Sequence, residues 1–114
     1  MFQEAGEASA VVGRQLAANA EAARAIGERL RSAPPRAVVT CARGSSDHAA
    51  TFAKYLIETR TGVLTSSAAL SVSSVYAARQ DLEGVLYIAI SQSGKSPDLL
   101  AAVEAAKAGG AFTV

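Results

Sequence analysis

Apolar residues along this chain fall into short continuous runs that alternate with helix-spaced stripes. Four apolar runs predict strands, at residues 37–41, 63–65, 85–90 and 111–114. Between them, apolar side chains recur at helical spacing and predict helices at about residues 47–60 and 97–108. The alternation of strand and helix predicts an α/β fold, with a parallel sheet covered by helices on both faces.

The same spacing predicts which helix faces are buried. In the helix at about residues 47–60 the expected apolar stripe consists of Ala49, Phe52, Ala53, Leu56 and Ile57. In the last helix it consists of Leu99, Leu100, Val103 and Ala106. Lys54 and Glu58 are spaced as partners on a solvated helix face. Residues 66–80 are rich in serine and alanine, and predict a loop with a short helix around residues 68–75.

The first third of the chain is alanine-rich and helical in character. Its apolar positions fall on two stripes, which predict two helices with a break near Ala18 and Asn19. Pro34 and Pro35 are expected to end the second helix. Residues 1–35 are therefore interpreted as a helical lead-in to an α/β domain at residues 36–114. The chain stops in an apolar strand, so we expect it to be the first part of a longer protein.

Two hydroxyl-rich turns follow predicted strands, Gly44–Ser46 after the first and Ser91–Ser96 after the third. The carboxyl ends of parallel strands share one edge, so the two turns can converge on a single crevice. Ser96 suits the N-cap of the following helix, and Pro97 suits its first position. A helix N-terminus offers free backbone N–H groups and a positive dipole end. The pattern thus predicts an anion site, best suited to phosphate.

Composition limits the binding partners and the kinds of site that the chain can have. Half of the residues are hydrophobic, 18% are charged and the net charge is +1, as in a globular domain. This balance gives no support for nucleic acid or a membrane as a partner. The lone cysteine, Cys41, excludes an intramolecular disulfide and a multi-cysteine metal site. No run is apolar enough for a membrane span, and no signal pattern is present, so a cytoplasmic protein is expected.

At the two turns the sequence resembles the sugar isomerase (SIS) domain family. The matching segments are Arg43–Ala49 after the first strand and Ser91–Ser96 after the third. The family's second signature is Ser-Gln-Ser-Gly-Glu-Thr in the isomerase domain of glucosamine-6-phosphate synthase. Here Lys95 replaces the glutamate, and Ser96 keeps the hydroxyl of the threonine. The short lead-in, with Phe2 at position 2, is more similar to stand-alone SIS enzymes than to the synthase, which carries a glutaminase domain ahead of this region.

The resemblance implies a three-layer αβα sandwich with a flavodoxin-like parallel sheet, of which residues 36–114 are the incomplete first half of a first SIS repeat. It implies that the phosphate of a phosphorylated hexose or hexosamine is held by Ser91, Gln92, Ser93 and Ser96. Gly44, Ser45 and Ser46 would approach the sugar hydroxyls and the carbonyl end. A homodimer is implied as well, and no cofactor or metal is expected.

The implied activity is that of an aminosugar-phosphate isomerase or deaminase, which moves a proton through an enediol-type intermediate. The family's catalytic glutamate, histidine and lysine lie in the second half of such proteins, so the catalytic residues are unknown here and expected beyond this chain. The alternative is a phosphosugar-sensing SIS domain of a transcriptional regulator, although residues 2–33 are too short and too weakly basic for a DNA-binding domain. A dinucleotide-binding domain would need a Gly-x-Gly-x-x-Gly turn, which is absent.

Four further residues near the turns have competing interpretations. His48 is a candidate acid–base, but a structural role beside Asp47 is favoured. Cys41 is interpreted as a buried thiol rather than a nucleophile. Arg43 either contacts a phosphate or covers the sheet edge. Asp47 is predicted to cap the first helix of the α/β domain.

Overall fold

The structure, a computed structural model, describes residues 2–114, apart from the side chains of Ser73 and Ser74. The chain forms two compact units, one ending at Pro34 and one formed by Pro35–Val114. The first unit is one helix, α1 (Phe2–Ser32). The predicted break near Ala18 and Asn19 is wrong. Alanine is the strongest helix former and asparagine only a weak helix breaker, and neither removes a backbone hydrogen bond as proline does.

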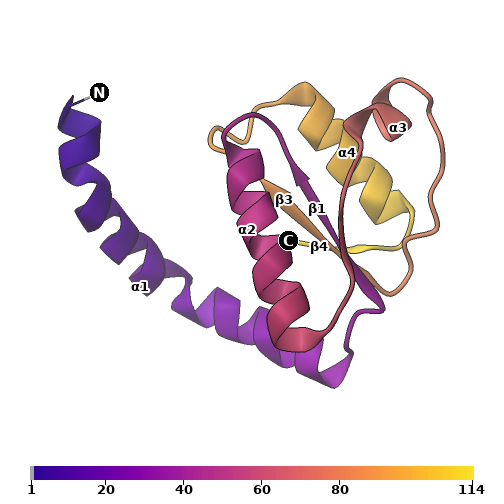
Figure 1. The fold of residues 1–114 in the computed structure, drawn as a ribbon, viewed down its shortest axis with the longest axis horizontal. Coiled ribbons are helices and arrows are strands. Elements are labelled where there is room, and N and C mark those ends of the chain that lie inside the picture. Colours follow the sequence, from indigo (N-terminus) through magenta and orange to yellow (C-terminus); the bar gives the residue numbers. More distant parts are fainter. Residues whose placement is uncertain (1) are drawn as a thin grey trace. The chain divides into compact units, whose positions relative to one another are not determined.

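The second unit alternates strands and helices along the chain, as Figure 1 shows. Its elements are β1 (Ala37–Ala42), α2 (Ser46–Thr61), β2 (Thr65–Ser67), α3 (Leu70–Ser74), β3 (Val85–Ile90), α4 (Pro97–Ala108) and β4 (Phe112–Thr113). All strand pairs are parallel, in the order β2-β1-β3-β4. The predicted parallel α/β fold is confirmed. The second strand lies later than residues 63–65, because Thr65 is the residue that pairs with Val38 of β1.

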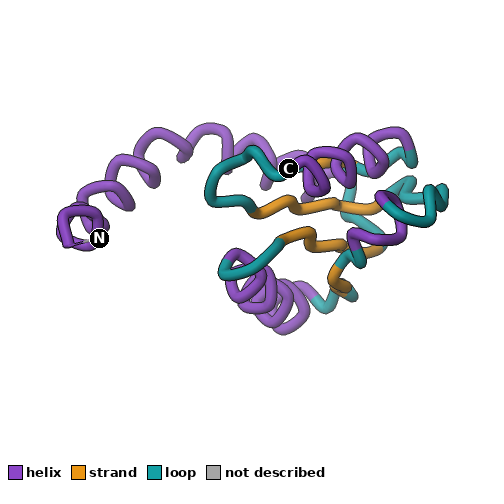
Figure 2. Tube along the Cα trace, turned by 90° about the horizontal axis from the view of Figure 1, so that it is seen from above, coloured by secondary structure: helices purple, strands orange, loops and turns teal. Residues whose placement is uncertain are grey.

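Figure 2 shows the sheet edge-on, with helices on both of its sides. Helix α2 contacts β1, β2 and β3 from one face, whereas α4 contacts β1, β3 and β4 and also packs against α3. The second unit is therefore the three-layer αβα sandwich that was expected. Gly62 ends α2 in the left-handed conformation, with φ of 72°, which is the usual role of glycine after a helix.

Burial on both faces of the central strands holds these layers together. On the face toward α4, Cys41 of β1 and Tyr87 of β3 pack with Leu99, Ala102 and Ala106. The opposite side chains of these strands are also buried, and they include Val38, Thr40 and Leu86. Continuous apolar runs in β1 and β3 are thus explained by a sheet that is covered twice.

The predicted helix faces are partly wrong. In α2 the residues turned inward are Ala50, Ala53 and Ile57, whereas Phe52 and Leu56 are 69% and 46% exposed. Apolar residues lie on two sides of α2, so their spacing gives a period but does not decide which stripe meets the sheet. In α4 Ala102 is buried although it was not part of the expected stripe. Leu100 was part of that stripe and is 49% exposed.

Glu58 has a structural contact that the sequence interpretation missed. It was expected on a solvated face of α2, but its Oε1 accepts the backbone N–H of Thr65 at 2.9 Å. The carboxylate thereby satisfies a donor at the beginning of the edge strand β2. This bond ties the end of α2 to the strand that follows it.

The strand order places a topological switch point between β1 and β3. From β1 the chain moves outward to β2 on one side, and it returns to add β3 and β4 on the other. An order of 2-1-3-4 is that of flavodoxin-like sheets, which bind ligands outside the carboxyl ends of the strands at this point. Ala42 and Ile90 are register partners, so both strands end at the same level.

We expect Gly109→Ala to destabilise the second unit by about 1–3 kcal/mol, the range for overpacked sites. A Cβ at Gly109 would stand 2.5 Å from the backbone oxygen of Gln80, which cannot move aside as a side-chain tip would. Denaturant unfolding measures the loss. Gly13→Ala is the control, because a Cβ there meets nothing within 4 Å and alanine favours the helix. Equal stability of the two variants would contradict the prediction.

Candidate functional site

The two hydroxyl-rich loops line one pocket of about 260 Å³ at the ends of β1 and β3. All of the residues predicted to bind substrate contribute to its wall: Gly44, Ser45, Ser46, Ser91, Gln92, Ser93 and Ser96. Arg43, Ile90 and Leu99 complete the lining. Nothing in the sequence pattern marked Ile90 or Leu99 as pocket residues, because they are ordinary apolar residues next to the loops. The switch point of the sheet is therefore where the expected residues meet, while their role as ligands stays a prediction.

The loop after β3 is organised by its own serine side chains. Ser91 Oγ accepts the N–H of Gly94 at 2.9 Å, and Ser93 Oγ accepts the N–H of Lys95 at 3.3 Å. Gly94 has a φ of 65°, which turns the chain back within this short loop. Each hydroxyl acts as an acceptor inside the loop, so its own O–H remains available to donate to a ligand.

The start of α4 offers backbone donors at the same pocket. Ser96 is the N-cap and Pro97 the first helical residue, as predicted, but the Ser96 side chain makes no capping hydrogen bond. The first amide to bond back is that of Leu100, which donates to the Ser96 carbonyl at 3.0 Å. Within residues 2–114 the amides of Asp98 and Leu99 have no acceptor. A helix start with open N–H groups is suited to an anion.

Helix α2 begins differently, and this distinguishes the two sides of the pocket. The amides of Ser46, Asp47 and His48 donate to the carbonyls of the preceding loop residues, at 3.1–3.3 Å. The predicted Asp47 cap is wrong. With these bonds to the residues three positions earlier, the helix starts at Ser46, with Ser45 at the N-cap position and Asp47 in the first turn. The α2 side thus presents hydroxyls more than open amides, so the α4 side is the better anion site.

The charged groups near the pocket nearly cancel. Arg43 Nη2 lies 2.9 Å from Asp98 Oδ2, and this ion pair joins the loop after β1 to the first turn of α4. Lys95 is exposed at the tip of its loop, and His48 is exposed in the first turn of α2 without lining the pocket. Arg43 therefore lines the pocket while it pairs with Asp98, and its contact with a phosphate stays a prediction.

Cys41 lies near the end of β1, two residues before Arg43, but its environment does not favour a nucleophile. The thiol is fully buried, and burial raises its pKa, against the smaller lowering effects of a hydrogen bond with Tyr87 and of the charge on Arg43. Burial also raises the pKa of Tyr87, and the hydrogen bond to Cys41 adds to this increase. A neutral buried thiol is inert, as the sequence interpretation expected.

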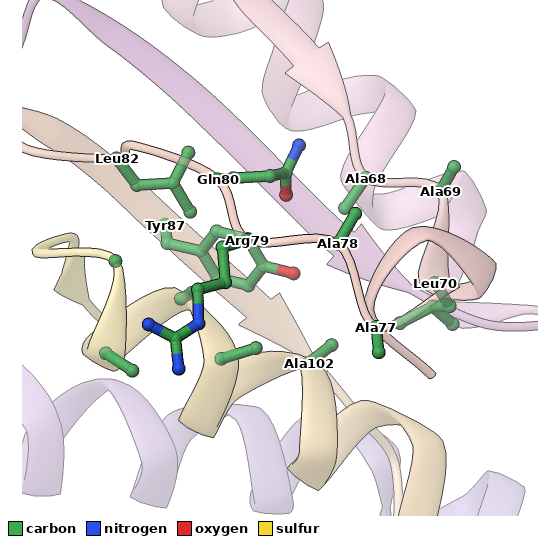
Figure 3. Close-up of a pocket in the computed structure, with 14 residues that line it drawn as sticks. Ala68, Ala69, Leu70, Ala77, Ala78, Arg79, Gln80, Leu82, Tyr87 and Ala102 are labelled. Carbon is green, nitrogen blue, oxygen red and sulfur yellow. The ribbon is translucent and has the colours of Figure 1, made fainter. Parts of the chain in front are cut away.

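A second, larger cavity of about 420 Å³ lies between β3, α4 and the segment before β3. Figure 3 shows Tyr87 and Leu82 on one side of it, with Ala77, Ala78, Arg79 and Gln80 along the covering segment. Most of its other walls are alanine side chains. Its size exceeds that of the first pocket, but the grouped hydroxyls and open amides lie in the smaller one. We therefore assign the candidate site to the smaller pocket.

Two other kinds of site are not found in the part of the chain that the structure describes. No cluster of three or more histidine, cysteine, aspartate or glutamate side chains there could hold a metal ion. None of the helices over residues 2–114 is long and apolar enough to cross a membrane.

The fold and this two-loop pocket define a flavodoxin-like α/β domain with a candidate anion site at its switch point. The chain is similar to a crystal structure described as a "putative phosphosugar isomerase" from Silicibacter pomeroyi DSS-3, with a TM-score of 0.93 and 40% sequence identity over 97% of this chain. The chain spans 34% of the length of that protein. No family model and no curated protein sequence matches the chain. The likeness supports the interpretation as a SIS-like domain.

We expect the stability of the second unit to fall above about pH 9. Cys41 and Tyr87 have pKa values raised above their ordinary 9.0 and 10.0, so the unfolded chain releases these protons first as the pH increases. Stability from this pair is complete below pH 9 and is lost at higher pH. Urea unfolding at pH 7, 9 and 10.5 measures it. Cys41→Ala should flatten the decline, and Tyr55→Phe, at an exposed tyrosine, should not. A flat profile in the parent would contradict this.

We expect Ser96→Ala to change the free energy of unfolding by less than about 0.5 kcal/mol. The usual cost of losing a serine N-cap is about 1 kcal/mol, but that cost requires a capping hydrogen bond, and Ser96 makes none. The same variant removes a hydroxyl from the pocket wall, so anion affinity should fall while stability is kept. Chemical denaturation and ligand titration of one preparation separate the two effects. A stability loss of 1 kcal/mol or more would show that Ser96 caps the helix after all.

Proposed function

We propose that residues 36–114 bind a phosphorylated hexose or hexosamine, as the SIS domain of an aminosugar-phosphate isomerase or deaminase. One observation carries the proposal, namely that both hydroxyl-rich loops line a single pocket beside the open N-terminus of α4. The description of the similar crystal structure as a phosphosugar isomerase supports the same class of ligand.

In the proposed complex the phosphate lies at the α4 side of the pocket. The hydroxyls of Ser91, Ser93 and Ser96 and the amides of Asp98 and Leu99 are donors to its oxygens. Gln92 adds a side-chain amide to the same wall. The sugar extends toward Gly44–Ser46, where hydroxyl groups suit its own hydroxyls and carbonyl. No metal is required, because charge-assisted N–H and O–H donors bind a phosphate directly.

The proton transfer needs a base that this pocket does not provide. Among the described residues, no aspartate, glutamate or histidine lines it. Aldose–ketose isomerisation and aminosugar deamination both require a group to move a proton between neighbouring carbons. We therefore propose that the base reaches the bound sugar from another part of the protein or from a second subunit. The homodimer and the cytoplasmic location stay predictions.

We expect the full-length protein to bind glucosamine 6-phosphate far more tightly than glucosamine, by calorimetric titration. Ser91→Ala with Ser93→Ala should weaken phosphosugar binding about a hundredfold or more, since each hydrogen bond to a charged group is worth about 1.5–3 kcal/mol. Part of that loss comes from the loop, because both hydroxyls also accept backbone N–H groups.

The control for this experiment is Thr59→Ala with Thr61→Ala. It removes two exposed hydroxyls that bond to carbonyls of their own helix, at the far end of α2. This pair should leave affinity unchanged. Equal binding of the two sugars, or full affinity in the double serine variant, would overturn the proposal. Incubation with glucosamine 6-phosphate then identifies the reaction: released ammonia marks a deaminase, isomerisation without ammonia marks an isomerase, and binding without turnover favours the sensor.

A further inference from the structure

The Arg43–Asp98 ion pair connects the loop after β1 to the first turn of α4 at the candidate site. Arg43 follows β1 and lines the pocket, and its Nη2 lies 2.9 Å from Oδ2 of Asp98. Asp98 belongs to the first turn of α4, two residues after Ser96. The pair therefore joins the sugar side of the pocket to the phosphate side. Neither residue would attract notice in the sequence as the partner of the other.

Asp98 creates an electrostatic conflict at this position. A carboxylate in the first turn of a helix is favourable, because it faces the positive end of the helix dipole. The same carboxylate repels a phosphate that approaches the open amides of this turn. A proposed anion site with a negative charge beside its donors needs a compensating positive charge. The Arg43 guanidinium is placed to supply it.

The ion pair is poorly suited to act as a mechanical clamp. The two side chains are 57% and 46% exposed, and pairs in water contribute little to stability. Charge compensation, in contrast, acts on any anion within about a Debye length of the pair, roughly 8–10 Å at physiological salt. The pair thus has more effect on a bound anion than on the fold.

We propose that Arg43 is a positioning residue that acts on the phosphate site through Asp98. Its guanidinium neutralises the Asp98 carboxylate and so keeps the N-terminus of α4 attractive to a phosphate dianion. This inference rests on the proposed function. It assigns a role to the Arg43–Asp98 pair, which is not needed for the phosphate loop to supply its own donors.

A double-mutant cycle tests the proposal in the full-length protein, with glucosamine 6-phosphate titrated by calorimetry. Arg43→Gln leaves Asp98 unpaired and should weaken binding about tenfold, as expected for one uncompensated charge near a dianion. Asp98→Asn removes the repulsion and should bind at least as tightly as the parent. The double variant has neither charge, and its affinity should return to within about twofold of the parent.

Two readouts separate charge compensation from a purely structural effect. Binding of unphosphorylated glucosamine should be the same in all four proteins, because it has no phosphate to repel. The loss in Arg43→Gln should shrink as salt is raised, because the charges are exposed. Lys107→Gln is the matched control. It breaks another exposed ion pair of 2.9 Å, with Glu104, at the far end of α4. It should leave phosphosugar affinity unchanged.

The remaining outcomes are distinct. A double variant as weak as Arg43→Gln would show that Arg43 contacts the phosphate itself, and the inference would be wrong. Equal losses in both single variants and in the double variant would show a geometric clamp and would also overturn it. Failure of the parent to prefer the phosphosugar would instead overturn the proposed function, and with it this inference. A parent that prefers the phosphosugar while Arg43→Gln binds it normally would overturn the inference alone.

Discussion

The parallel pairing of β1 with β3 is the constraint on which the rest of the second unit depends. The two strands are matched over their whole length, from Ala37 with Val85 to Ala42 with Ile90. Because they end at the same level, the loops that follow them leave the sheet side by side. The strands are not consecutive in the chain, so this neighbourhood exists only because β2 is placed on the outer side of β1. The pocket is thus a product of strand order.

The same pairing provides a rigid base for polar loops. Cys41 and Tyr87 fill one face of the two strands, and Val38 and Leu86 fill the other. Among the described residues, no buried side-chain nitrogen or oxygen lacks a hydrogen-bond partner, so this core leaves no buried polar side chain unpaired. Above this packed layer, the residues from Ser91 to Lys95 are exposed. Loops positioned by a close-packed scaffold are the usual places for ligand binding.

The sequence was sufficient where local physics decides the outcome. β1 and β3 are continuously apolar, and α4 is preceded by Ser96 and begins with Pro97. The predicted positions of these three elements are confirmed. It was insufficient where tertiary pairing decides. The inner face of α2 depends on which of two apolar stripes the sheet covers, and Phe52 fell on the wrong one. The position of β2 depends on its register with Val38 and on the Glu58 carboxylate at Thr65.

The site shows the same division between local and tertiary information. Each hydroxyl-rich turn could be recognised from its own residues, but the difference between the two helix starts could not. That difference lies in whether the first amides of each helix are occupied. In α2 the loop carbonyls take the amides of Ser46, Asp47 and His48, whereas in α4 Pro97 has no N–H and Ser96 leaves the next amides open. Two turns of similar composition therefore differ in their open backbone donors, and this difference is why we propose the α4 side of the pocket for the phosphate.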